Sequence, residues 1–347
     1  MRDWGKSIQV AATYIGTIVG AGFASGQEIL AFFTSYGVWG TIGILLTTGL
    51  FSWLGYKMMR IAREIGSPSY ESFNKALFGP LIGRIINLMV FLTLLGVTTV
   101  MLAGSGAIFD QQFRLSYLFG ILATIALAML ALSKGLERLL MVNSLVVPAM
   151  LLFSCLLLAS SPETARILPH QPPTQYGFLW EAILYVSFNL AMAQSVLIPM
   201  GYQIRNVQVL RNGAILGGLG LGFMLIVAHM AMLANWNDVR LMDIPMAFIT
   251  EQWNDYLGFF FVIVLYAEIF TTLISNVYGI TEQLRELLTL DPRTIQLSLF
   301  TVSFAFCLFG YAQLLLFLYP LFGYLGLATL VRIGVYRRYA GAALFRR

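Results

Sequence analysis

Charged residues are scarce in this sequence of 347 residues. They make up only 11% of it, whereas soluble domains contain about 25%. Hydrophobic residues make up 59%, and the mean hydropathy is +0.80. A soluble protein of this length cannot bury that much apolar surface. The composition therefore excludes soluble, disordered and fibrous proteins and indicates an integral membrane protein.

Cysteine and histidine are also rare, with two of each. Cys155 and Cys307 both lie inside apolar runs, where a cysteine usually acts as a small buried hydrophobic residue. The cysteines and histidines do not cluster, and none has the spacing of a zinc or haem site. We therefore expect no zinc, haem or other resident cofactor.

The basic residues give the chain a net charge of +5, but they lie at the ends of apolar segments and form no nucleic-acid-binding patch. A membrane-spanning helix needs about 20 apolar residues. We identify ten such segments, at residues 7–34, 38–60, 83–109, 115–133, 139–160, 178–201, 211–234, 256–282, 295–310 and 313–335. With the N-terminus in the cytoplasm, 18 Lys and Arg residues fall in inner loops and three, Arg114, Arg166 and Arg240, in outer loops. This asymmetry predicts ten membrane spans with both termini in the cytoplasm.

The loops are mostly short, so we expect residues 1–347 to form a single membrane domain. One inner loop contains an amphipathic stretch, residues 70–78, which we expect on the membrane surface or across the inner mouth of the bundle. Because each half has an odd number of spans, five, the second half is inverted relative to the first. We therefore predict two inverted repeats, at residues 1–160 and 178–335.

The first span contains a glycine-rich stretch at membrane depth, GTIVGAGFASGQE, residues 16–28. Four glycines within eleven residues disfavour a continuous helix. An alternative role for them is close helix packing, because small residues four apart let helices approach each other. The neighbouring Ser25, Gln27 and Glu28 favour a break, since polar residues are costly inside a span. We predict a discontinuous helix whose freed backbone groups face a solute and an ion.

The sixth span, residues 178–201, also carries polar side chains. Glu181, Tyr185 and Asn189 lie on one helical face. Interrupted helices at corresponding places in two inverted halves are the best sequence indication of a transporter binding site. We therefore expect a second break at residues 188–193. This expectation depends on polarity alone, because the span has no glycine pair at its centre.

The eighth span carries a polar stripe on an otherwise apolar helix. Its members recur at helical spacing and are Glu268, Thr271, Thr272, Ser275 and Asn276. Hydroxyl oxygens are hard ligands that suit a hard cation. The alternative is hydrogen bonding between helices, which is common for Ser and Thr in membranes. A carboxylate among five polar residues favours a functional role.

The stretch GTIVGAGFASGQEI, residues 16–29, resembles the signature of the YkvI-like bacterial membrane proteins of the amino acid–polyamine–organocation superfamily. The likeness extends along the whole chain. It implies the all-α LeuT-like fold, with two inverted five-helix repeats and with helices one and six unwound around the substrate. In that fold one sodium ion sits between helix one and helix eight. The sodium ligands implied here are the carbonyls of Gly20, Ala21 and Phe23 and the hydroxyls of Thr271, Thr272 and Ser275.

Some proton-coupled relatives place a Lys on helix five where this sodium would sit. The fifth span here, residues 139–160, has no Lys, which favours sodium. Proton coupling stays open as an alternative, with Glu28 or Glu268 as the carrier. We assign Glu28, Glu268 and Asn276 to coupling or gating.

These residues together predict a cation-coupled symporter of an amino acid or a related small amine. A half-helix that begins after Gly26 offers N–H groups to a carboxylate, and freed carbonyls suit an ammonium group or the cation. The expected substrate-binding residues are Gly22, Phe23, Ser25, Gly26, Tyr185, Ser187, Phe188 and Asn189. The resemblance implies alternating access, in which spans one, two, six and seven rock against the rest.

Other functions are compatible with the same fold, because fold does not determine function. An exporter, a channel and a non-transporting ligand sensor all stay open. An intramembrane serine protease is disfavoured, because the spacing around Ser25 is wrong and only His229 lies in a span as a candidate base. We therefore expect no enzyme. The sequence leaves the solute and the oligomeric state undetermined.

Overall fold

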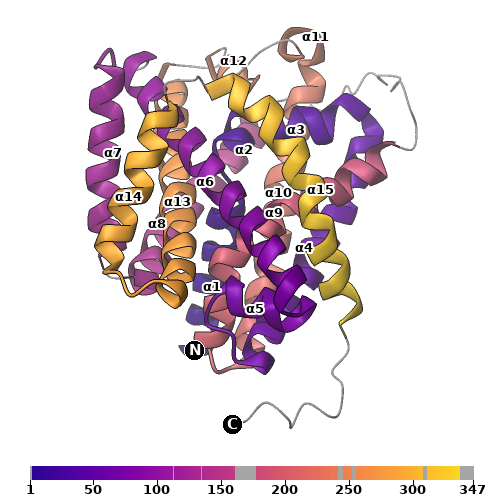
Figure 1. Ribbon diagram of the computed structural model, residues 1–347. Coiled ribbons are helices and arrows are strands. Elements are labelled where there is room, and N and C mark those ends of the chain that lie inside the picture. Colours follow the sequence, from indigo (N-terminus) through magenta and orange to yellow (C-terminus); the bar gives the residue numbers. More distant parts are fainter. Residues whose placement is uncertain are drawn as a thin grey trace.

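The computed structural model describes residues 2–111, 113–133, 135–160, 177–240, 245–251, 255–307 and 311–336. Within these ranges all regular structure is helical, and no strand occurs. Most of the helices run lengthwise through one bundle (Figure 1).

The ten predicted apolar segments all correspond to helices. The first half of the chain forms α1 (Arg2–Ile18), α2 (Ala21–Ser25), α3 (Gln27–Phe32), the 3-10 helix η1 (Thr34–Tyr36), α4 (Val38–Ile65), α5 (Tyr70–Phe78), α6 (Pro80–Gln111), α7 (Tyr117–Leu132) and α8 (Gly135–Ser160). The second half forms α9 (Gly177–Gln203), α10 (Val207–Ala234), α11 (Trp236–Val239), α12 (Pro245–Glu251), α13 (Asp255–Leu287), α14 (Pro292–Phe306) and α15 (Tyr311–Val335). The first predicted span is divided among α1, α2 and α3.

Five helices are long and apolar enough to cross a membrane, namely α4, α6, α9, α10 and α13. Shorter apolar stretches lie in α7, α8 and α15. The outer surface of the bundle is itself apolar, since Leu81, Leu130 and Val331 are each more than half exposed. Such a surface is stable only against lipid. The protein is therefore an integral membrane protein, and the number of ten spans and their orientation stay predictions.

The amphipathic stretch at residues 70–78 is the helix α5. Ser69 starts it with a capping box, in which its side chain accepts the N–H of Ser72. The apolar face of α5 packs on α6, and Tyr70 donates a hydrogen bond to Gln283 of α13. In Figure 1, α5 lies at the lower end of the bundle, where α1 begins. Of the two expected positions, α5 thus takes the one across the end of the bundle.

The predicted break in the first span is confirmed. α1 ends at Ile18, and Gly20 adopts an extended conformation with φ −138° and ψ −167°. α2 then makes little more than one turn before Gly26, whose φ of +87° ends it. Only glycine adopts such a left-handed conformation without steric cost. The two glycines thus interrupt the span at two places, six residues apart.

The predicted break in the sixth span is wrong. α9 continues without interruption from Gly177 to Gln203, with Pro199 inside it. Polar residues in a span must find partners but do not require an unwound backbone. In α9, Asn189 donates its side-chain N–H to the Tyr185 carbonyl at 2.9 Å, within the helix. The segment also lacks the glycines that unwind the first span.

The helices of spans one, two, six and seven form one packed group. α1 packs against α9 and α10, and α4 packs against both of these helices. Glycines bring α10 close to α1: a Cβ at Gly217 would lie 2.7 Å from the Tyr14 ring, and one at Gly220 would lie 2.7 Å from Ile15. The Tyr14 hydroxyl in turn donates to the Phe51 carbonyl of α4 at 2.9 Å. α13 packs against both α6 and α8, and α8 also packs against α1 and α10.

Candidate functional site

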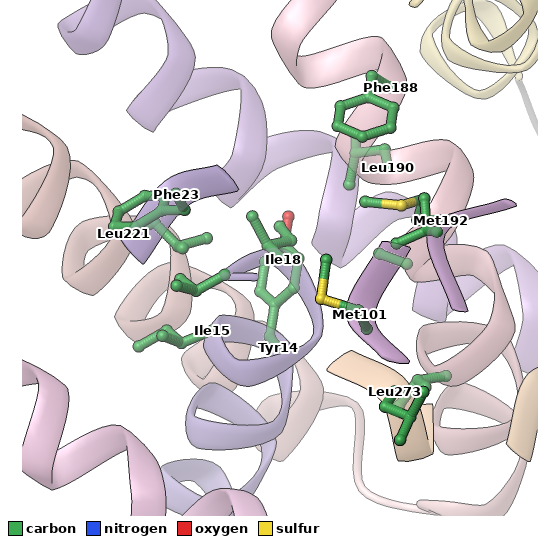
Figure 2. Close-up of a cluster of buried hydrophobic side chains, with 14 of the residues drawn as sticks. Tyr14, Ile15, Ile18, Phe23, Met101, Phe188, Leu190, Met192, Leu221 and Leu273 are labelled. Atoms are coloured by element: carbon green, nitrogen blue, oxygen red, sulfur yellow. The ribbon is translucent and has the colours of Figure 1, made fainter. Parts of the chain in front are cut away.

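The gap between α1 and α2 is contacted directly by α13. The Thr272 hydroxyl donates a hydrogen bond of 2.6 Å to the carbonyl of Val19. Glycine at position 20 permits this approach, because a Cβ there would lie 3.2 Å from the same hydroxyl oxygen. Met101 of α6 also reaches this place, with its terminal carbon 3.5 Å from that Cβ position. Figure 2 labels Ile18, Phe23, Met101 and Leu273 within one cluster of buried side chains.

The other two hydroxyls predicted to bind sodium are directed along their own helix. Thr271 donates to the Glu268 carbonyl at 3.1 Å, and Ser275 donates to the Thr271 carbonyl at 2.7 Å. Both residues are fully buried. Of Thr271, Thr272 and Ser275, Thr272 is therefore the residue whose hydroxyl reaches the break. Sequence reasoning missed the Val19 carbonyl, because nothing in the sequence distinguishes it from the carbonyls of its neighbours.

The carbonyls predicted to bind sodium have backbone partners. The Gly20 carbonyl accepts the N–H of Ala24 at 2.9 Å, and the Phe23 carbonyl accepts the N–H of Gly26 at 3.0 Å. Ala21 is the first residue of α2. A carbonyl oxygen has two lone pairs, so these bonds leave one acceptor position on each.

Glu268 and Asn276 lie one turn to either side of Thr272 on the same face of α13. Both side chains are completely buried. Within the described part of the chain, neither carboxylate oxygen of Glu268 and neither amide atom of Asn276 has a hydrogen-bond partner. Buried polar groups without partners are costly in a protein and more so in a membrane. These two side chains are therefore candidates for binding a ligand.

Glu28 belongs to α3, which follows the broken segment, and its side chain reaches back to α2. Its carboxylate folds back over α2, so that a Cβ at Gly22 would collide with it. Ser25 donates to the Gly22 carbonyl at 3.1 Å and accepts the N–H of Gln27 at 3.4 Å. The absence of a side chain at Gly22 thus makes room for the carboxylate.

Two of the predicted residues of the sixth span meet Glu28. The Tyr185 ring packs against Phe32 and Phe33, with centroid distances of 5.3 and 5.0 Å. Its hydroxyl lies near the Glu28 carboxylate and the Asn189 side chain, and it makes no hydrogen bond within the described residues. Asn189 is completely buried, and its Oδ1 atom has no partner in the described residues. The structure therefore brings Gly22, Ser25, Glu28, Tyr185 and Asn189 together.

Ser187 and Phe188 contact α15, and their role as substrate-binding residues stays a prediction. The Ser187 hydroxyl donates to the Gly323 carbonyl of α15 at 2.8 Å. The Phe188 ring stacks on Phe322 of α15 with a centroid distance of 6.3 Å. A hydroxyl and an aromatic ring are side chains typical of a binding site. In the continuous helix α9, both are turned toward α15.

The second interruption, at Gly26, is covered by other helices. A Cβ at Gly26 would lie 2.9 Å from Met246 of α12 and 3.1 Å from the Met232 sulfur of α10. α12 also contacts α2 and α13. In Figure 1, α12 lies at the end of the bundle opposite to the start of α1. The broken segment is thus closed from that end.

Hydrogen bonds to two threonines account for the burial of His229. Its Nδ1 atom is 3.1 Å from the Thr34 hydroxyl, and its Nε2 atom is 3.1 Å from the Thr41 hydroxyl. Both ring nitrogens are therefore used, and the Ser25 hydroxyl is bonded to the Gly22 carbonyl. This arrangement contains no serine–histidine pair of the kind that a protease needs.

Comparison with known proteins places the chain in a family. The spore germination protein family of permeases matches residues 6–313. The chain belongs to this spore germination permease family. The uncharacterized membrane protein YkvI of Bacillus subtilis is 36% identical over 327 residues, which cover 93% of this chain and 94% of YkvI. The uncharacterized protein YyaD of the same species is 25% identical over 337 residues, or 96% of this chain and 97% of YyaD. The predicted YkvI-like membership is confirmed.

Solved structures resemble this permease in fold. The Eremococcus coleocola manganese transporter has a TM-score of 0.62 at 12% identity, covering 94% of this chain and 76% of that chain. Mhp1, a nucleobase-cation-symport-1 family transporter, has a TM-score of 0.60 at 13% identity, covering 94% of this chain and 77% of its own. Identities this low establish the fold alone. The predicted LeuT-like fold is confirmed, apart from the continuous α9.

Proposed function

We propose that this permease family member is a cation-coupled secondary transporter of a small amine-containing solute. The observation that carries the proposal is the hydrogen bond from Thr272 to the Val19 carbonyl at the break. One turn away lies the buried Glu268 carboxylate, which has no hydrogen-bond partner among the described residues. A discontinuous helix of this kind is the feature by which transporters of this architecture bind solute and ion. Proteins described as a manganese transporter and a cation-symport family transporter share the fold.

Sodium is the coupling ion in this proposal. The Thr272 hydroxyl and the Val19 carbonyl are hard oxygen ligands, and Glu268 supplies negative charge on the same face of α13. Thr271 and Ser275 would join them by rotating their hydroxyls away from the carbonyls of α13. The remaining candidate ligands are the carbonyls of Gly20, Ala21 and Phe23.

Binding of the ion and binding of the solute would be coupled, because both would contact the same broken segment of backbone. The ion would bind where α1 ends, and the solute would bind beside α2 near Gly22, Glu28 and Asn189. Because both ligands hold the same broken segment, each lowers the cost of ordering it for the other. Alternating access would then arise from movement of the packed group α1, α4, α9 and α10 against the remaining helices.

Substitution of Thr272 tests the ion site. Thr272→Val keeps the shape of the side chain and removes the hydroxyl. We expect the sodium affinity to fall about tenfold, which corresponds to about 1.4 kcal/mol of binding free energy. The measurement is the thermal stability of the purified protein in sodium against choline at matched ionic strength, because an ion that binds the folded state raises stability.

The matched control is Thr281→Val on the same helix. Its hydroxyl donates to the Val277 carbonyl at 2.6 Å, and the residue is equally buried. We expect this variant to keep the wild-type sodium dependence. Equal sodium dependence of both variants and the wild type would show that the assigned ion site is wrong.

Reconstitution into proteoliposomes separates the remaining alternatives. Solute uptake driven by a sodium gradient supports the proposal, whereas uptake driven only by a pH gradient indicates proton coupling. Unitary currents would indicate a channel. Solute binding without flux would indicate a sensor, and flux in the outward direction alone would indicate an exporter.

A further inference from the structure

The helix α5, at the end of the bundle where α1 begins, joins two sets of helices (Figure 1). It contacts α4 and α9, which belong to the packed group of the first span, and also α6 and α13, which lie outside that group. It is their covalent link as well, because α4 precedes it and α6 follows it in the chain. Movement of the packed group against the remaining helices must therefore move α5 relative to some of its neighbours.

The body of α5 is bonded to α6. Asn74 donates its side-chain N–H to Asn87 of α6 at 2.8 Å, and Asn87 donates to the Glu71 carbonyl at 3.2 Å. The two helices are close here, because a Cβ at Gly83 of α6 would lie 2.7 Å from the Cα atom of Lys75. These contacts hold most of α5 on the helix that follows it.

The first residue of α5 is bonded to α13 instead. The Tyr70 hydroxyl donates to the Gln283 side chain, and both side chains are buried. Only residues 66–69 separate Tyr70 from α4, so this end of α5 must follow a movement of α4. The bond from Tyr70 to Gln283 therefore crosses between the packed group and the helices outside it. Separation of these helices at this end must break it, whereas the bonds to α6 can stay.

A glycine with a positive φ lies at each end of α5. Gly66, with φ +77°, follows α4, and Gly79, with φ +81°, follows α5. A Cβ at either position would have no neighbour within 4 Å, so close packing does not hold these two residues in place. Such positions can absorb the change in backbone angles that a moving helix requires.

Polar side chains without partners lie between this bond and the break in the first span. Thr272, Asn276 and Gln283 share one face of α13. Asn276 and Gln194 of α9 are completely buried, and no side-chain amide atom of either has a hydrogen-bond partner within the described residues. Amides in this state are costly in a closed bundle and become hydrated once water enters. They therefore indicate a second state in which this region is wet.

The interface between α9 and α13 is tight at this level. Ser195, the neighbour of Gln194, is buried, and a Cβ at Gly279 of α13 would collide with its side chain. The Ser195 hydroxyl donates to the Met192 carbonyl within α9 at 2.7 Å, so it makes no bond to α13 that would resist separation. Water can reach the buried amides only if these two helices move apart.

We propose that α5 is the gate at this end of the bundle and that the bond from Tyr70 to Gln283 holds it closed. This inference deepens the proposed function and rests on it, because the gate belongs to the path of the same solute and ion. When the bond breaks, Tyr70 follows α4, the ends of α9 and α13 separate, and water reaches Gln194 and Asn276. At the opposite end, α12 covers the broken segment, so the structure is closed at both ends.

The reactivity of a buried cysteine tests the gate in the purified full-length protein. In a background that lacks Cys155 and Cys307, Ser195→Cys places a thiol between α9 and α13 with little change in side-chain size. Tyr70→Phe removes the hydroxyl alone. We expect this substitution to raise the reaction rate of the thiol with a charged methanethiosulfonate reagent roughly fivefold, the effect of one net hydrogen bond on the closed state. Equal rates with Tyr70 and with Tyr70→Phe would overturn the proposal.

Two controls separate opening of the gate from general loosening. Tyr266→Phe also removes a tyrosine hydroxyl, which lies 2.9 Å from the Thr124 hydroxyl between α13 and α7, and it should leave the reaction of Ser195→Cys unchanged. Ser303→Cys on α14 is completely buried and should react at the same rate with and without Tyr70→Phe. Faster reaction of both thiols would mean that Tyr70→Phe loosens the whole bundle, and it would overturn the proposal.

A variant at Gln283 tests the bond from its other side. Gln283→Leu removes the acceptor and should also speed the reaction of Ser195→Cys. The double variant with Tyr70→Phe should react no faster than Gln283→Leu alone, because one bond can be lost only once. A rate equal to the product of the two single effects would show that the side chains act separately, and it would overturn the role of the bond.

Flux measurements distinguish failure of the gate from failure of the proposed function. Sodium-driven uptake by the wild type, together with no effect of Tyr70→Phe on labelling, would overturn the gate and leave the proposed function standing. The expected labelling without flux of any solute under any ion gradient would contradict the proposed function and leave the closure by α5 standing.

Discussion

Individual hydrogen bonds between distant residues hold the broken first span in place. Thr272 binds the Val19 carbonyl at one end of the break, and His229 joins Thr34 and Thr41 beyond the other end. These bonds connect residues that lie about 200 or more positions apart in the chain. A segment with few backbone bonds of its own depends on such contacts to keep one conformation.

Removal of the His229 side chain should weaken this part of the structure. His229→Leu removes the partner of the buried Thr34 hydroxyl and of the half-buried Thr41 hydroxyl, and we expect a loss of roughly 2 kcal/mol in stability. Thr41→Val removes one of the two bonds and should cost about half as much. Thermal unfolding in detergent measures both. Equal stability of His229→Leu and the wild type would mean that the two bonds contribute nothing.

At the scale of helices, small residues determine how closely the spans pack. Gly217 and Gly220 of α10 face Tyr14 and Ile15 of α1, and Gly55 of α4 faces the Tyr14 ring. A helix pair that meets through glycines has little room for added atoms. This packing makes α1, α4 and α10 one unit, which is what a rigid moving group requires.

Gly217→Ala tests that packing. The new methyl group would lie 2.7 Å from the Tyr14 ring, whose hydroxyl is held by the Phe51 carbonyl. We expect a loss of roughly 1–3 kcal/mol in stability, the usual cost of overpacking. The control is Gly49→Ala on α4, where nothing lies within 4 Å. The control should be neutral or slightly stabilising, because Ala favours a helix. Similar melting temperatures for the two variants would contradict this account of the interface.

At the scale of the whole molecule, the distribution of basic residues predicts the orientation in the membrane. Arg114 lies in the connection between α6 and α7, on the predicted outer side, and Glu64 lies near the end of α4 on the predicted inner side. Both residues are exposed in the structure, so cysteines placed there are accessible to reagents.

Cysteine labelling of intact cells measures this orientation. In a background that lacks Cys155 and Cys307, we expect Arg114→Cys to react with a membrane-impermeant maleimide. Glu64→Cys should react only after the membrane is opened. The reverse pattern would show that the predicted orientation of the bundle is inverted.

The sequence by itself determined the membrane class, the positions of the helices and the break at Gly20. These features depend on local properties, namely apolar length and the conformational freedom of glycine. The family signature lies in the same local segment. The amphipathic stretch at residues 70–78 was likewise visible, because its pattern repeats within nine residues.

Only the tertiary structure decided which side chains meet. Polarity indicated a break in α9, but the helix is continuous and turns Ser187 and Phe188 toward α15. The stripe on α13 predicted three hydroxyl ligands, and packing brings Thr272 to the Val19 carbonyl. A helical pattern shows which residues share a face, but the neighbour of that face depends on contacts between segments far apart in the chain.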